Sequence, residues 1–239
     1  MASLDGVEIK ASLGTKGIEP AMERFGLTWE SGTRRTIWFC EAAPTEKSTT
    51  PLGDRHVVVR LRRAAGDGDS DSTVKIRPFT PPLPSPWDHY DGDDQLKVEG
   101  DWTGESHPDS ASLVSTQPGP EIDAAVDGRS KLATVLSGDQ ERFFARYAGD
   151  IGIHDLRALG PIDAVKWKPE GLGFRLDVAV EHWAVDDLRF LELSIRTGHP
   201  GEAVDLQAEF AAFLRQEGLL EFVEGATKTS TVLDHLARR

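Results

Sequence analysis

The sequence has very little cysteine and no long apolar run. Cys40 is the single cysteine in 239 residues, which excludes an internal disulfide and a cysteine-rich zinc site and is typical of a reducing compartment. No segment approaches the roughly 20 consecutive apolar residues of a membrane span, and Met1 to Lys10 contain no apolar secretion signal. We therefore expect a cytoplasmic protein without a membrane partner.

Basic residues are also scarce relative to acidic ones. The chain has 27 Lys and Arg against 40 Asp and Glu, a formal net charge of −13, which argues against a nucleic-acid partner. Hydrophobic residues make up only 38% of the sequence, enough for a core if long polar loops are also present. The seven histidines show no metal-ligand spacing, so a zinc site is not predicted.

Glycine, proline, serine and aspartate concentrate in three stretches that we expect to be irregular: 64–72, 78–95 and 104–119. Helical spacing and helix-end residues predict the following helices: Glu19–Phe25 with Gly26 as its stop, two within Ile122–Ala148, one over Ala203–Leu214 before Gly218, and a short one after Thr231.

The most informative pattern is a period-two alternation in which apolar residues occupy one face of a strand and charged residues the other. Seven segments show it: Val7–Lys10, Val57–Arg62, Thr73–Arg77, Leu96–Asp101, Val165–Lys168, Phe174–Glu181 and Arg189–Arg196. An eighth candidate strand, Thr36–Cys40, is more uniformly apolar.

Two architectures fit this alternation. The ordinary one is an antiparallel sheet with one core face and one solvated face. However, Arg, Lys, Glu and Asp recur as pairs two residues apart, whereas exposed strand faces usually carry Thr and Ser. Strands with this composition could instead close into a barrel with a charged interior and an apolar outside that the amphipathic helices cover. Such an interior would suit a polyphosphate chelated by a divalent cation.

The order of the charged pairs resembles the CYTH superfamily, the triphosphate tunnel metalloenzymes. The matching segments are Glu8-Ile9-Lys10, Arg60-Leu61-Arg62, Thr73-Val74-Lys75, Glu99-Gly100-Asp101, Lys166-Trp167-Lys168, Arg175-Leu176-Asp177 and Glu192-Leu193-Ser194. The family's first strand reads Glu-x-Glu-x-Lys and its last Glu-x-Glu, so Gly6 and Ser194 each stand where the family has a carboxylate.

The resemblance implies an α+β fold: a closed or nearly closed eight-stranded antiparallel barrel, or tunnel, with helices packed outside. One CYTH-like domain would span 1–239, with a Pro/Asp-rich loop at 78–95, a helical insert at 122–148 and C-terminal helices in 200–239.

The resemblance also implies roles for individual residues. The cations that would contact phosphate oxygens are Lys10, Arg60, Arg62, Lys75, Lys166 and Lys168. The carboxylates that would hold Mg²⁺ or Mn²⁺ or position water are Glu8, Glu99, Asp101, Asp177 and Glu192. Glu99 and Lys75 are the predicted catalytic pair, for attack of water on the terminal phosphorus with the metal as Lewis acid.

The leading hypothesis is a divalent-metal-dependent phosphohydrolase acting on a small-molecule triphosphate or inorganic tripolyphosphate. The alternative is a non-catalytic binder of phosphorylated ligands, for which Gly6 and Ser194 are the evidence. A structural antiparallel domain would require the charge alternation to be accidental. The natural substrate, cyclase as against phosphatase chemistry, and assembly into a homo-oligomer stay open.

Overall fold

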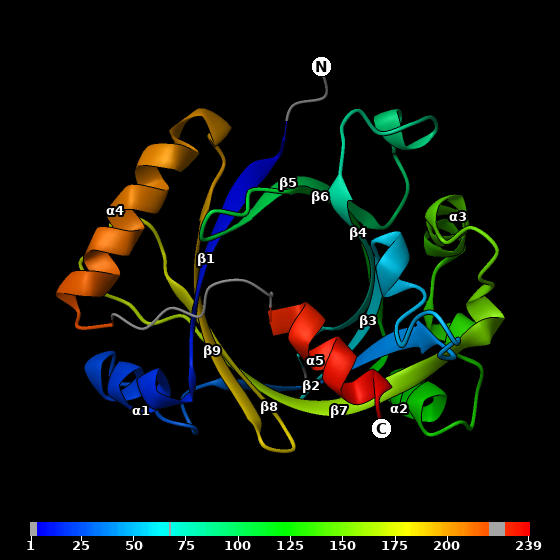
Figure 1. Cartoon of the computed structure of the whole chain (residues 1–239), viewed down its shortest axis with the longest axis horizontal. Helices are drawn as coiled ribbons and strands as arrows, with labels where there is room; N and C mark the ends of the chain where they lie inside the picture. Colours follow the sequence, from blue (N-terminus) through cyan, green and yellow to red (C-terminus); the bar gives the residue numbers. More distant parts are fainter. Residues whose placement is uncertain (1–3, 67, 220–227) are drawn as a thin grey trace.

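A computed structural model describes residues 4–66, 68–219 and 228–239. Within them, nine strands form a closed barrel (Figure 1). The strands are β1 Gly6–Leu13, β2 Thr33–Ala42, β3 Val57–Ala64, β4 Ser70–Phe79, β5 Gln95–Thr103, β6 Asp109–Gln117, β7 Leu156–Trp167, β8 Ala179–Val185 and β9 Leu188–Thr197. The α-helices are α1 Thr15–Arg24, α2 Gly119–Val126, α3 Gly138–Tyr147, α4 Ala203–Gln216 and α5 Lys228–Ala237. The short 3₁₀ turns are Gly53–Arg55, Trp87–His89, Leu132–Val135, Ile153–Asp155 and Pro200–Glu202.

Around the barrel the strands follow the order β1-β5-β6-β4-β3-β2-β7-β8-β9, and β9 returns to β1. Every neighbouring pair is antiparallel except β1 and β5, which run parallel. The predicted α+β barrel is therefore confirmed, with nine strands in place of eight and with one parallel pair.

The strand that the sequence does not predict is β6, which lies in the 104–119 stretch that the composition predicts to be irregular. Its alternation is carried by small residues, because Ser110, Ser112, Val114 and Thr116 alternate with Ala111, Leu113 and Ser115. Serine is common in loops, so this sequence gives a weak strand signal. Pairing with β4 on one side and β5 on the other decides its conformation.

The predicted strand Phe174–Glu181 is wrong over its first half, since β8 begins only at Ala179. Gly171 and Gly173 precede this segment with positive φ angles of +70° and +78°, which break an extended chain. Phe174 then packs against Phe210 and Phe213 of α4 with tilted rings, whose centroids lie 5.5 and 5.2 Å from its own. Packing against a helix thus replaces pairing in the sheet.

The helix predictions hold with shifted bounds. α1 begins at Thr15, earlier than the predicted Glu19, and contains Pro20 in its interior. The 122–148 region contains α2 and α3, as predicted. The predicted C-terminal helical region 200–239 contains α4 and α5, while 220–227 lies outside the described residues.

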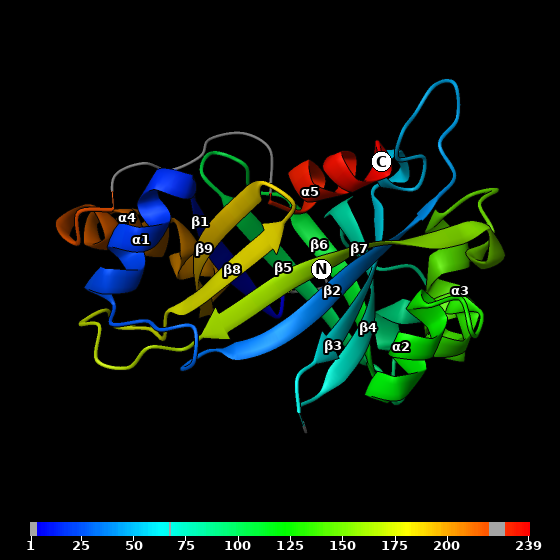
Figure 2. The ribbon, with the colours of Figure 1, turned by 90° about the horizontal axis from the view of Figure 1, so that it is seen from below.

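Helices on opposite sides of the barrel cover its apolar outer face (Figures 1 and 2). α1 and α4 pack on the outward residues of β1 and β9, such as Ile9 and Leu193. α2 and α3 pack on β3, β4 and β6, where Phe143 and Phe144 of α3 are fully buried. Each such large apolar side chain stabilises the fold by about 1.5–3 kcal/mol. Because the helices take the apolar face, the charged face is left pointing inward.

α5 lies across one end of the barrel (Figure 1). Its Val232, Leu233 and Leu236 pack against Phe39 and Trp183 of the barrel strands. No helix in the described part of the chain combines the length and apolar character that a bilayer crossing requires.

Candidate functional site

The inside of the barrel is a charged cavity of about 350 Å³. Strand register explains why its charges converge, since directly opposed residues of neighbouring strands face the same side of a sheet. Glu8 of β1 lies opposite Asp101 of β5 and Arg196 of β9, and Glu181 of β8 lies opposite Glu192 of β9. The alternation seen in the sequence is therefore the inward face of a closed wall.

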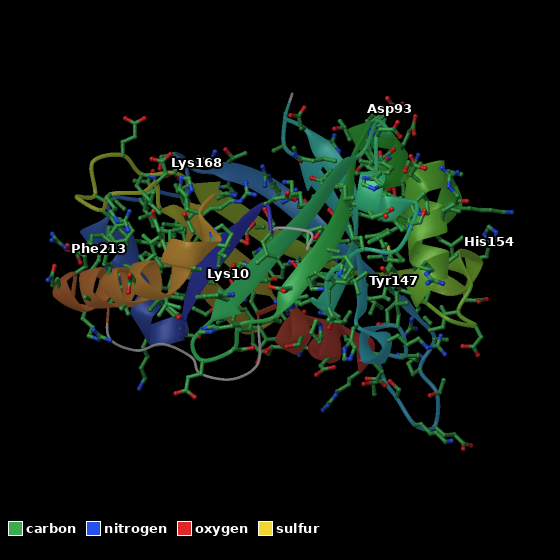
Figure 3. All side chains as sticks on the ribbon, turned by 90° about the horizontal axis from the view of Figure 1, so that it is seen from above. Lys10, Asp93, Tyr147, His154, Lys168 and Phe213 are labelled. Atoms are coloured by element: carbon green, nitrogen blue, oxygen red, sulfur yellow. The ribbon has the colours of Figure 1, made fainter. Side chains whose placement is uncertain are left out.

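Most of the predicted site residues line this cavity. They are Glu8, Lys10, Arg60, Arg62, Lys75, Glu99, Asp101, Lys166 and Glu192. The structure does not bring two of the predicted residues to the cavity: Lys168 and Asp177 are exposed and lie outside it. Lys168, labelled in Figure 3, follows the last residue of β7, and Asp177 lies in the irregular segment before β8.

The cavity also contains charged residues that were not predicted as site residues: Arg77, Lys97, Glu181, Arg196 and Lys228. The first four continue the same alternation, two or four residues from a predicted neighbour, so extending the pattern along each strand would have found them. Lys228 belongs to α5, and the strand alternation carries no signal for it.

Asp101 is the centre of an ionic network at one side of the cavity. Its Oδ1 lies 2.6 Å from the Lys10 Nζ, and its Oδ2 lies 2.6 Å from the Lys75 Nζ and 3.1 Å from Arg77 Nη1. Burial disfavours the charged carboxylate, but the three cations outweigh burial and hold the pKa of Asp101 well below its ordinary value. Burial also opposes the charge on Lys10, yet Glu8 and Asp101 raise the pKa of that ammonium.

Arg60 and Arg62 of β3 and Lys166 of β7 form a cationic wall of the cavity. Arg35 of β2 is close enough to interact with Arg62 but lines a different pocket. Arg62 Nη2 is paired with Asp71 Oδ2 at 2.7 Å, whereas Arg60 Nη2 lies 3.5 Å from the Thr73 hydroxyl oxygen. Among the described residues, the buried Nε atoms of Arg35 and Arg60 have no hydrogen-bond partner. A buried donor without an acceptor costs about 1–3 kcal/mol, so this wall is short of acceptor oxygens.

The pKa values of the cationic wall reflect the same shortage of negative charge. Burial, together with the neighbouring Arg62, lowers the pKa of Arg60 to about 10 and also lowers that of Arg35. Burial lowers the pKa of Lys166, and Glu181 offsets this only in part. An anionic ligand would reverse these shifts by restoring the missing counter-charge.

The carboxylates of the cavity do not form a ready metal site. Glu8 is paired with Lys10 at 2.9 Å, Glu99 with Arg196, and both Glu181 and Glu192 with Lys228. Carboxylate oxygens are the donors that Mg²⁺ and Mn²⁺ prefer, but here a cation of the chain neutralises each group. Across 4–66, 68–219 and 228–239, no three His, Cys, Asp or Glu side chains gather as a metal-binding group. The predicted metal ligands therefore do not fit a bound metal in this arrangement.

Gly6 stands where the family resemblance implies a further carboxylate, and the backbone is fitted to glycine there. A Cβ at this position would lie 2.5 Å from the carbonyl oxygen of Thr197 on β9. A glutamate could enter only if β1 and β9 moved apart. The reduced carboxylate set is thus built into the strand packing.

Comparison with known proteins finds likeness at the level of structure. No family model matches the sequence, and no curated protein matches it significantly. A candidate adenylyl cyclase from Hippeastrum, described as having a dominant triphosphatase activity, is 14% identical and superposes with a TM-score of 0.63 over 95% of this chain and 94% of its own. A candidate adenylate cyclase from Bacillus halodurans is 12% identical, with a TM-score of 0.63 over 97% of this chain and 98% of its own. These likenesses show that the chain has the same fold as these two proteins.

Proposed function

We propose that the barrel binds the triphosphate group of a small molecule, or inorganic tripolyphosphate, and hydrolyses its terminal phosphoanhydride bond. The observation that carries the proposal is the cationic wall of the cavity, where the buried Nε of Arg60 has no acceptor among the described residues. Phosphate oxygens are acceptors that match guanidinium geometry and charge. The triphosphatase activity described for the Hippeastrum protein of the same fold supports this choice of ligand.

The chemistry requires little beyond positioning and charge. The oxygen of a water molecule bonds to the terminal phosphorus, the bridging P–O bond breaks, and the shortened phosphate chain leaves as an anion. Arg60, Arg62 and Lys166 would stabilise the negative charge that spreads over the phosphoryl oxygens. Because these cations are fixed on strands, they need no reorganisation during the reaction.

Glu99 and Lys75 are the proposed catalytic pair. Both line the cavity, and Lys75 is held in place by Asp101. Burial lowers the pKa of Lys75 although Asp101 opposes it, so this ammonium gives up a proton more readily than a surface lysine. Lys75 would donate a hydrogen bond to the departing phosphate oxygen, and Glu99, once Arg196 turns to the ligand, would accept the proton of the attacking water.

The second candidate is a binder that does not turn its ligand over. The glycine-fitted backbone at Gly6 favours it, together with the pairing of every cavity carboxylate to a cation. Such a cavity would retain the anion without activating water.

The test measures phosphate release from tripolyphosphate, thiamine triphosphate and ATP, with Mg²⁺, Mn²⁺ or a chelator, alongside thermal stabilisation by each ligand. Arg60→Ala should lower ligand affinity by at least tenfold, whereas Lys168→Ala, which changes an exposed lysine outside the cavity, should behave as wild type. Release that falls in Arg60→Ala supports the hydrolase, and stabilisation without release supports the binder. Binding that survives Arg60→Ala and Lys166→Ala together contradicts both.

A further inference from the structure

A second cavity, of about 570 Å³, lies on the outer face of the barrel, and we call it the outer pocket. Thr36 of β2 is paired with Arg63 of β3 and with Asp163 of β7, so these three side chains share one face of the sheet. All three line the outer pocket, whereas Arg62, the neighbour of Arg63, lines the interior. In Figure 2 none of the described helices lies in front of the middle of β2 and β7. The outer pocket is therefore open to solvent.

Two arginines of the outer pocket have N–H groups to offer. Arg34 is exposed, and in the described part of the chain its guanidinium has no ion-pair or hydrogen-bond partner. Arg63 is held in place, because its Nε lies 3.1 Å from Asp123 Oδ2 and its Nη1 donates to the Ala64 carbonyl oxygen. A guanidinium has more N–H donors than these two contacts use. One free arginine and one fixed arginine thus border the same space.

The charge of the lining favours an anion. Arg35 also lines the outer pocket, so three arginines stand against two carboxylates, Asp123 and Asp163, among the described residues. Arg63 already engages Asp123. The chain as a whole has a formal net charge of −13, so an excess of cations around one cavity runs against the rest of the surface. Such a local excess raises the concentration of anions at the pocket.

An aromatic wall completes the outer pocket. Trp29 is partly exposed, and its ring meets that of His182 edge-on, with centroids 4.8 Å apart. Burial lowers the pKa of His182 to about 4, so its imidazole is neutral near pH 7 and adds no charge. A flat group of a ligand could therefore pack beside Trp29 while the arginines hold its charged end.

We propose that the outer pocket binds the phosphate group of a small molecule. Arg34 and Arg63 donate to the phosphate oxygens, since guanidinium groups match their geometry and charge. Thr36, paired with Arg63 across the sheet, adds a hydroxyl donor. A volume of about 570 Å³ lies in the range of sites that take small-molecule ligands. Orthophosphate and a phosphate monoester share this chemistry.

The test titrates isotope-labelled protein with orthophosphate or with AMP, in the absence of metal ions, and follows the indole N–H signal of Trp29 by NMR. The signal should shift saturably, and Arg34→Ala should weaken the binding at least fivefold. Arg157→Ala removes another exposed arginine, on β7 but outside the outer pocket, and should match wild type. AMP that binds at least threefold more tightly than orthophosphate identifies a monoester, and equal affinities identify free phosphate.

Two outcomes overturn the proposal. The first is the absence of a saturable Trp29 shift with either probe up to about 20 mM. The second is an equal loss in Arg34→Ala and Arg157→Ala, because binding would then depend on net charge alone. Arg60→Ala, in the barrel interior, should leave the Trp29 titration within twofold of wild type, and a loss there would place the bound phosphate in the barrel instead. The two cavities share no lining residue among those described, so this result is separate from that of the proposed hydrolysis.

Discussion

Replacing Asp101 by asparagine tests the ionic network at the centre of the cavity. The substitution keeps the size of the side chain but removes the charge that Lys10, Lys75 and Arg77 share. Asp101 is 2% exposed, so water cannot replace the lost counter-charge. Breaking a buried ion pair by removing one partner costs about 3–5 kcal/mol, because the other partner stays buried and unpaired.

This loss in the free energy of unfolding should lower the melting temperature markedly. For a chain of this size, 1 kcal/mol corresponds to about 2–4 °C, so Asp101→Asn should melt about 6–20 °C below wild type. Differential scanning calorimetry in a phosphate-free buffer measures this shift. Tripolyphosphate should then raise the melting temperature of Asp101→Asn more than that of wild type, because its oxygens would replace the negative charge that the three cations lose with Asp101.

The control is Asp163→Asn, which makes the same change at an exposed position on β7. It should alter the melting temperature by less than about 2 °C, as surface substitutions usually do. If Asp101→Asn also melts within about 2 °C of wild type, the network does not hold the barrel together. If tripolyphosphate stabilises both variants and wild type equally, the three cations do not meet the ligand.

Three further predictions address stability. Lys228 lowers the pKa of Glu181 to about 2 from an ordinary value near 4.5, so the ion pair stabilises the fold above about pH 4.5 and this stabilisation is lost as the pH falls toward 2. The free energy of unfolding in urea should therefore fall by about 3 kcal/mol less on acidification in Glu181→Gln than in wild type. The same pH dependence in both proteins would contradict the pairing. Gln140 is fully buried, and its side-chain amide donates hydrogen bonds to backbone carbonyls of β4 and β6. Gln140→Leu should therefore lower the free energy of unfolding by about 2–4 kcal/mol in a denaturant titration. An unchanged free energy of unfolding would show that these carbonyls find other donors. Gly6→Ala places a Cβ 2.5 Å from the Thr197 carbonyl oxygen and should lower the free energy of unfolding by about 1–3 kcal/mol. Gly198→Ala is the matched control, because its added Cβ would meet nothing within 4 Å, and it should be close to neutral in the same denaturant titration.

The barrel could be predicted because the order of its charged pairs resembles a known family; the alternation alone also fitted an open antiparallel sheet. In most proteins, alternation of apolar and polar residues along a strand distinguishes a core face from a solvent-exposed face. Here charged pairs such as Arg60 and Arg62 lie on the inward face of each strand. The same parity placed Glu8, Asp101 and Glu192 correctly, since a strand side chain is fixed by its position in the alternation.

The failures lie where local pattern does not decide conformation. β6 alternates serine with small apolar residues, so its strand character comes from its partners. Asp177 lies in a segment that packs against α4, and Lys168 falls one residue beyond the end of β7. Arg35 shares its face with Ile37 and Phe39 in a strand that appears uniformly apolar.

The position of Lys228 inside the barrel could not be predicted from the sequence. A lysine at the start of a short C-terminal helix is ordinarily solvated, and nothing nearby in the sequence marks Glu181 or Glu192 as its partners. The contact joins a helix to two strands that precede it by tens of residues in the chain. Only the closure of the barrel brings these groups together.

The position of β1 has a consequence for how the chain is made. β1 pairs with β5, where Glu8 meets Asp101, and with β9, where Glu8 meets Arg196. During synthesis from the N-terminus, the first strand must therefore wait for almost the whole chain before its second edge is covered. Contacts this distant in sequence slow folding, since a long loop must close before they form. Until β9 has been synthesised, the inward face of the open barrel is exposed to water. This face carries Lys, Arg, Glu and Asp, which water solvates well, so the incomplete barrel resists aggregation through it.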